Sequence, residues 1–161
     1  MMKQEKIGRF IAAVVALFFA FSLFGCNRSD NVTPEVANDE IALQIMLDTK
    51  EDIGLLIVDY DANGSRGSGG TSLADKSPLK QGERIAYTLK KRDFDNPSDV
   101  KNMSVRFTVI TEYVEPNYEN IYPTEYAKPA GAISLEADFG KCYFITISGD
   151  KTNGYKAVLE P

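Results

Sequence analysis

Apolar and polar residues alternate along most of the chain after residue 40. Ile41, Leu43, Ile45 and Leu47 alternate with less apolar residues, which is typical of a strand with one buried face. The same pattern predicts strands at 84–91, 103–109, 132–137, 142–148 and 155–159. A continuous apolar run at 53–60 predicts a more deeply buried, central strand.

Turn-forming residues separate the predicted strands. Clusters of Asp, Asn, Gly and Pro at 93–98, 138–141 and 149–154 predict turns. The segment 61–82 is rich in Gly, Ser and Lys, and we expect it to be one long loop. Because glycine lies in both turns between the last three strands, we expect 132–159 to form consecutive hairpins.

The predicted elements indicate an all-β fold. About seven short strands in roughly 120 residues, with turns between them and no helix, are typical of a β-sandwich. We expect a single immunoglobulin-like or transthyretin-like sandwich over residues 41–161, and a small β-barrel is the alternative. A domain of this length buries enough apolar surface to fold without disulfides.

The first 25 residues have a different pattern. Lys3, Lys6 and Arg9 precede a run, 10–24, that is apolar except for Ser22. This run of about 15 residues is shorter than the roughly 20 that span a bilayer as a helix. A basic segment followed by a short apolar one predicts a secretory signal peptide at 1–25, separate from the folded domain.

The end of the apolar run carries the motif Leu23-Phe24-Gly25-Cys26. It resembles the lipobox of bacterial lipoproteins, and this resemblance implies that diacylglycerol is attached to Cys26 and that cleavage follows Gly25. Residues 26–40 would then be the lipidated Cys26 and a polar, flexible tether. The resemblance implies an extracytoplasmic protein that is anchored to a membrane by lipid, since two or three acyl chains give stable attachment.

Composition narrows the possible chemistry. The chain has no His, which excludes His-based triads and His metal sites, and its two Cys are too few for a disulfide scaffold. Cys142 lies in a predicted strand, where we expect it to act as a small apolar residue. We therefore expect no enzyme, and a carboxylate-based hydrolase or a protease inhibitor is a less favoured alternative.

Without residues 1–25 the chain keeps 15 basic and 22 acidic side chains, a net charge of −7, which argues against nucleic acid as a partner.

One short motif suggests a metal. Asp59, Asp61, Asn63 and Gly64 match the first half of a calcium-binding loop, whose alternate oxygen ligands surround a hard cation. The twelfth position is Gly70 instead of the usual Glu, and the same residue types are common in any turn that follows a strand. We therefore expect a turn without metal or cofactor, with calcium binding as the alternative.

The segment 113–129 interleaves tyrosines with glutamates. Exposed tyrosines stack on sugars or anchor protein interfaces, so the candidate binding residues are Tyr113, Tyr118, Tyr122 and Tyr126. The alternative is that these tyrosines cover one end of the sandwich. The sequence thus predicts a binding module for a protein or glycan partner, and the alternative function is a structural or accessory subunit of a cell-envelope complex.

Overall fold

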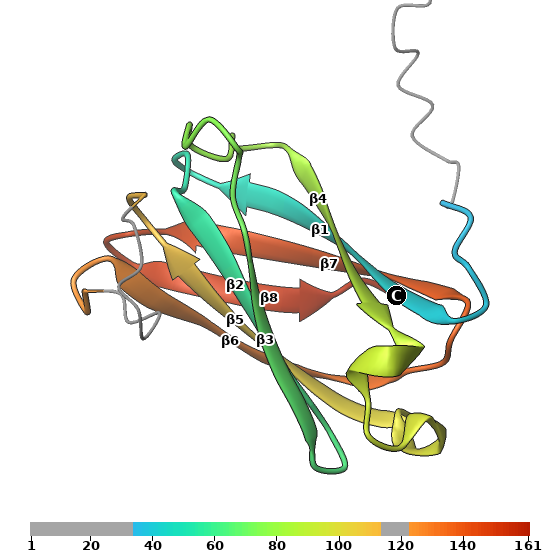
Figure 1. The fold of residues 1–161 in the computed structure, drawn as a ribbon. Coiled ribbons are helices and arrows are strands. Elements are labelled where there is room, and N and C mark those ends of the chain that lie inside the picture. The colour runs from blue at the N-terminus through green and yellow to red at the C-terminus, as the bar shows by residue number, and fades with distance from the viewer. Residues whose placement is uncertain (1–33, 114–122) are drawn as a thin grey trace, which may run out of the picture. The chain divides into compact units, whose positions relative to one another are not determined.

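Eight β-strands form two packed sheets in residues 34–113 and 123–161, which the computed structural model describes (Figure 1). Two 3-10 turns, η1 (Lys91–Asp93) and η2 (Pro97–Asp99), follow β4. Nothing helical in these residues has the length and apolarity of a membrane span. The strands are β1 (Glu40–Thr49), β2 (Leu55–Ala62), β3 (Ser65–Thr71), β4 (Arg84–Lys90), β5 (Asn102–Ile110), β6 (Ala127–Glu136), β7 (Lys141–Asp150) and β8 (Gly154–Leu159).

The strand order is β4-β1-β7-β8 in one sheet and β3-β2-β5-β6 in the other. All strand pairs are antiparallel except β1 and β7, which lie side by side in parallel although they come from opposite ends of the domain (Figure 1). This arrangement confirms the predicted all-β sandwich. The sheets are open and do not close on themselves, as the alternative barrel would require.

The core lies between the two sheets and follows the predicted alternation. Every second side chain of β1 points inward, and Ile41, Leu43, Ile45 and Leu47 are fully buried. On β5 the same period of two buries Met103, Val105, Phe107 and Val109 from the other side. Burial of apolar side chains of this size stabilises the fold by about 1.5–3 kcal/mol each relative to exposure.

The segment predicted as one long loop, 61–82, contains strand β3, so that prediction is wrong over Ser65–Thr71. Asn63 and Gly64 have φ angles of 50° and 98° and make a two-residue turn between β2 and β3. An Asn-Gly pair suits such a turn because both residues accept positive φ. The apolar alternation is missing from β3 because two of its inward positions are glycines.

The last three strands do not form consecutive hairpins as predicted. β6 pairs with β5 in one sheet, whereas β7 and β8 form a hairpin in the other. The chain crosses from one sheet to the other at residues 137–140, where Gly140 has a φ of 78°. β6 also begins at Ala127, inside the segment that we expected to be an insertion.

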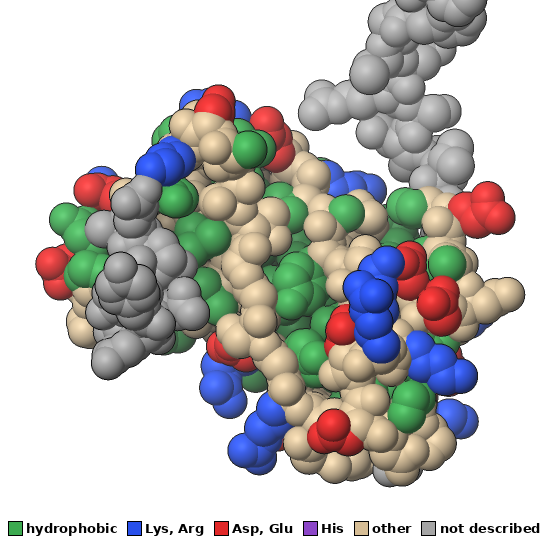
Figure 2. Space-filling view, in the orientation of Figure 1, with side chains coloured by type: hydrophobic (Ala, Val, Ile, Leu, Met, Phe, Trp, Pro, Cys, Tyr) green, Lys and Arg blue, Asp and Glu red, His purple; other side chains and the backbone are tan. Residues whose placement is uncertain are grey.

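The two inward glycines of β3 make room for tyrosine rings. A Cβ built at Gly67 would collide with the ring of Tyr60, and one at Gly69 would collide with the hydroxyl of Tyr87. Tyr60 lies on β2 and donates its hydroxyl to the carbonyl of Asp93 at 2.9 Å. In Figure 2 the backbone of β3 shows as a tan band with apolar side chains on either side. The edge strand β3 therefore has no inward side chains at these two positions, and the rings of Tyr60 and Tyr87 fill the space between it and the core.

Hydrogen bonds tie the β7–β8 turn to the segment after β1. Lys50 pairs with Asp150 at 2.7 Å, and Asp150 also accepts hydrogen bonds from the backbone of Thr152 and Asn153. Tyr155 donates to Glu51 within the same network. The bonds from Lys50 and Asn153 hold the pKa of the Asp150 carboxyl well below its usual range.

Substitution Gly67→Ala tests the fit of Tyr60 against β3. We expect it to lower the free energy of unfolding by about 1–3 kcal/mol, because the added methyl group overpacks the site. Chemical denaturation measures the change. Ser68→Thr on the outward side of the same strand is the control and should change stability little, and the double change Gly67→Ala with Tyr60→Leu should recover part of the loss. Unchanged stability in Gly67→Ala would contradict this packing.

Substitution Asp150→Asn tests the turn network through its dependence on pH. A carboxyl whose pKa is lowered by folding adds stability above its unfolded pKa of about 3.9, and that stability is lost as the pH falls further. We expect the variant to be less stable than the parent at pH 6 and to lose less stability between pH 5 and about pH 2. Urea titrations across this range measure the effect, with the exposed Asp48→Asn as control. Parallel curves for parent and Asp150→Asn would refute the network.

Candidate functional site

The outward face of the β3-β2-β5-β6 sheet carries opposite charges on neighbouring strands. On β2 the residues Val58 and Tyr60 point into the core, so Asp59 and Asp61 point out. Asp59 lies opposite Arg106 of β5, and Asp61 lies opposite Arg66 of β3. The register therefore builds two cross-strand rows, each with one carboxylate and one guanidinium.

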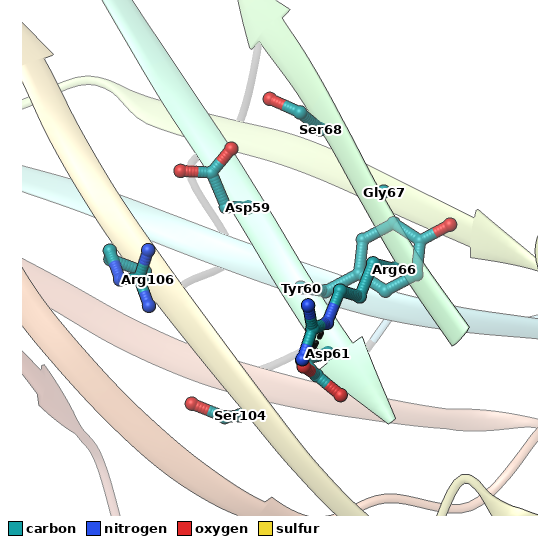
Figure 3. Close-up of a pocket in the computed structure, with 8 residues that line it drawn as sticks. All are labelled: Asp59, Tyr60, Asp61, Arg66, Gly67, Ser68, Ser104 and Arg106. Carbon is teal, nitrogen blue, oxygen red and sulfur yellow. Dashed lines mark hydrogen bonds and ion pairs between the residues drawn. The ribbon is translucent and has the colours of Figure 1, made fainter. Parts of the chain in front are cut away.

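These rows surround a shallow hollow of about 570 Å³. Figure 3 shows the side chains that line it, which come from three strands. A second hollow, of about 440 Å³, shares Ser104 and continues toward Glu136 of β6. The first hollow has the volume of a small-molecule site, although its polar lining differs from the usual apolar pocket. Its lining residues are Asp59, Tyr60, Asp61, Arg66, Gly67, Ser68, Ser104 and Arg106.

Asp61 is fully engaged by its neighbours. Its carboxylate accepts hydrogen bonds from the backbone of Gly64 at 3.2 Å and from Nε of Arg66 at 2.6 Å. The bond from Gly64, followed by that from Arg66, lowers the pKa of Asp61. A general acid needs the opposite shift, so this carboxylate does not suit proton donation.

Asp59 and Arg106, unlike Asp61, are not engaged by neighbouring side chains. Although they lie opposite each other, no hydrogen bond or ion pair joins either side chain to another described residue, and Figure 3 marks only the pair of Asp61 with Arg66. The hydroxyls of Ser68 and Ser104 lie in the same two rows. The hollow thus offers one carboxylate, one guanidinium and two hydroxyls to a polar ligand.

The candidate calcium residues are only partly brought together. Asp59 and Asp61 share the outward face of β2, whereas Asn63 lies in the turn that follows. Both oxygens of Asp61 already accept bonds from Gly64 and Arg66. Among the described residues no three acidic or cysteine side chains gather as a metal-binding group. The segment is a strand and a two-residue turn instead of a cation-binding loop.

The structure places two of the four candidate tyrosines. Tyr113 and Tyr126 are half-buried, and Tyr118 and Tyr122 lie outside the described residues, as does Cys26. The backbone of Thr111 donates to the carbonyl of Tyr126 at 3.0 Å, next to the last pair of β5 and β6. Lys76 lies over the ring of Tyr113 at 5.9 Å. Binding by these four tyrosines stays a prediction.

The middle of the outward face of the other sheet is uncharged, although Glu40, Asp48 and Lys156 lie on the same face around it. Arg84 of β4 stacks on the ring of Phe144 at 5.5 Å. Cys142 is half-buried on β7, as predicted, and burial raises the pKa of its thiol. Depletion of charge together with Phe, Met and Arg is typical of the centre of a protein interface. The uncharged face is formed by Ala42, Gln44, Met46, Cys142, Phe144, Thr146 and Ser148.

Sequence analysis missed the basic and hydroxyl residues of the hollow. Ser104 and Arg106 occupy the polar positions of a strand that was predicted correctly, so their outward direction was available from the alternation. Arg66 and Ser68 were assigned to a loop. Only the pairing of β2 with β3 and β5 brings these residues beside Asp59 and Asp61.

Neither a protein-family model nor a curated protein matches this chain. Solved structures with some similarity include a Gram negative toxin (11% identity, TM-score 0.36, covering 78% of this chain and 23% of that chain). Others are pneumolysin (12%, 0.34, 78% and 24%) and the human-specific toxin intermedilysin (12%, 0.37, 77% and 24%). This chain therefore spans about a quarter of the length of each. A likeness at this level carries no argument about function.

Proposed function

We propose that the protein is a lipid-anchored, extracytoplasmic binding module of the bacterial cell envelope. The observation that carries the proposal is the charged hollow, in which Asp59 and Arg106 stand unpaired among the described residues on a rigid sheet. Such groups recognise ligands, because a bound partner supplies the hydrogen bonds that they lack within the domain. We also propose that the sandwich is of the immunoglobulin-like or transthyretin-like type.

The lipid anchor rests on the motif Leu23-Phe24-Gly25-Cys26 and on the basic and apolar residues before it. Lipid on Cys26 would hold the domain at a membrane surface through about 14 residues of polar tether. Extended chain covers at most about 3.3–3.6 Å per residue, so the domain would stay within about 50 Å of the membrane. The proposal therefore describes a module that captures its ligand close to the membrane.

Substitution Cys26→Ser tests the anchor. In a bacterial host we expect the parent to incorporate a clickable fatty acid and to sediment with membranes, whereas Cys26→Ser takes up no label. Cys142→Ser is the matched control and should be labelled like the parent, because its thiol lies in β7. Labelling of Cys26→Ser, or an unlabelled parent, would refute lipid attachment at this residue.

The alternative function, an accessory subunit of an envelope complex, is favoured by the uncharged face of the β4-β1-β7-β8 sheet. A protein partner with an apolar, uncharged centre would suit this face, because the seven residues in its middle carry no charge that burial would leave unpaired, whereas Asp48, Arg84 and Lys156 lie around them. Thr146 lies near its centre, between Met46 on β1 and Val158 on β8.

Substitution Thr146→Lys tests the accessory-subunit alternative. If the face is an interface, a buried charge disrupts it, and the protein solubilised from native membranes should shift on a native gel from a larger assembly to the size of the single chain. Thr108→Lys on the outward side of β5, outside the hollow, is the matched control and should leave the assembly intact. Equal migration of Thr146→Lys and the parent would count against a partner on this face.

A further inference from the structure

Asp59 and Arg106 are two opposite charges that the fold places side by side without joining them. They are directly opposed in the register of β2 and β5, which brings the Cβ atoms of such residues to about 5 Å. At this separation the side chains are long enough to pair, yet Figure 3 shows no contact between them. The pair of Asp61 and Arg66, one row along, shows that the same face does support a direct ion pair at 2.6 Å.

The unpaired charges lie within a hollow and are not scattered on a convex surface. Both side chains line the volume of about 570 Å³, together with Ser68 and Ser104. Strands on a packed sheet hold the four residues, and the core residues Val58 and Phe107, which alternate with them, are fully buried. The spacing of the two charges is therefore set by the sheet and not by a flexible loop.

The charges of the hollow sum to zero, from two aspartates and two arginines. A ligand with only an anionic group would bind at Arg106 but would meet the carboxylate of Asp59 beside it. A ligand with only an ammonium group would meet Arg106 in the same way. A ligand that carries both groups satisfies both side chains and leaves the hollow neutral, so complementarity favours it over either single charge.

We propose that this hollow binds a zwitterion, a ligand with an anionic group and an ammonium group a few bonds apart. The guanidinium of Arg106 donates to the anionic group, and the carboxylate of Asp59 accepts from the ammonium group. The hydroxyls of Ser68 and Ser104 complete the hydrogen bonds around the two groups. This inference deepens the proposed binding function and rests on it, because it assigns a ligand class to the same hollow.

The experiment measures binding of defined probes to the full chain in a non-ionic detergent by calorimetry. The zwitterionic probes are glycerophosphoethanolamine, which represents a lipid headgroup, and glycylglycine, which represents a peptide with free ends. Glycerophosphoglycerol, a phosphodiester without an amine, and ethanolamine are the probes with one charge. We expect one zwitterion to bind at least about tenfold more tightly than either singly charged probe, since each missing partner removes a charge-assisted hydrogen bond. The preferred zwitterion then identifies the source of the ligand.

Variants locate the binding in the hollow. Asp59→Asn and Arg106→Gln should each weaken binding at least about tenfold, whereas Asp48→Asn and Arg84→Gln on the other sheet should not. Because a zwitterion can bind in either direction, the double reversal Asp59→Arg with Arg106→Asp should restore binding that each single reversal removes. The unfolding temperature of every variant is measured as well. A variant that unfolds at the same temperature as the parent but does not bind has lost the ligand site and not the fold.

Several results would overturn the proposal that the hollow binds a zwitterion. These are equal binding of a singly charged probe, no binding of either zwitterion, or variants of Asp59 and Arg106 that bind like the parent. Tight binding of glycerophosphoglycerol alone would leave a binding module with an anionic ligand, so the broader function would survive. The lipid anchor is tested separately by Cys26→Ser, and its failure would not change the binding data.

Discussion

The parallel pairing of β1 with β7 is the constraint on which the domain depends. β1 lies between β4 and β7, and its apolar side lines one wall of the core over Ile41, Leu43, Ile45 and Leu47. A parallel pair cannot be closed by a short turn, and here five strands, β2 to β6, lie between its two members in the chain. Because this pairing joins distant parts of the chain, loop closure makes it an intrinsically slow folding step.

The same alternation that builds the core decides what reaches the two outer faces. On β2 and β5 the residues between the core positions are charged or hydroxylated, whereas on β1 and β7 the central ones are uncharged. A shift of the pairing between β2 and β5 by one residue would turn Asp59 inward and Val58 outward. The buried apolar side chains therefore fix the position of the charged hollow, although none of them needs to contact a ligand.

The fold class and most strands could be predicted from the sequence, because inward side chains such as Ile45 and Phe107 recur at every second position. β3 could not be predicted in this way, since Gly67 and Gly69 replace its inward side chains and leave the space to Tyr60 and Tyr87. Phe94 lies in a segment predicted as a turn, yet it is buried against Tyr60.

The hollow depends on which strands are neighbours, and no local pattern specifies that. Arg106 and Asp59 each show as a polar position in a strand, but their opposition comes from the pairing of β2 with β5. The sequence also could not show that β6 and β7 lie in different sheets. A glycine-containing turn suits a hairpin and a crossing between sheets equally well.

The central place of β1 also determines how the domain responds to load. The polar segment before Glu40 leads directly into this strand, which is held along its length by β4 on one side and β7 on the other. Tension applied through that segment therefore acts first on a strand that is hydrogen-bonded along both of its edges. β8, at the edge of the sheet, has bonds to one neighbour only, whereas pulling β1 out of the sheet would have to break its bonds to both β4 and β7.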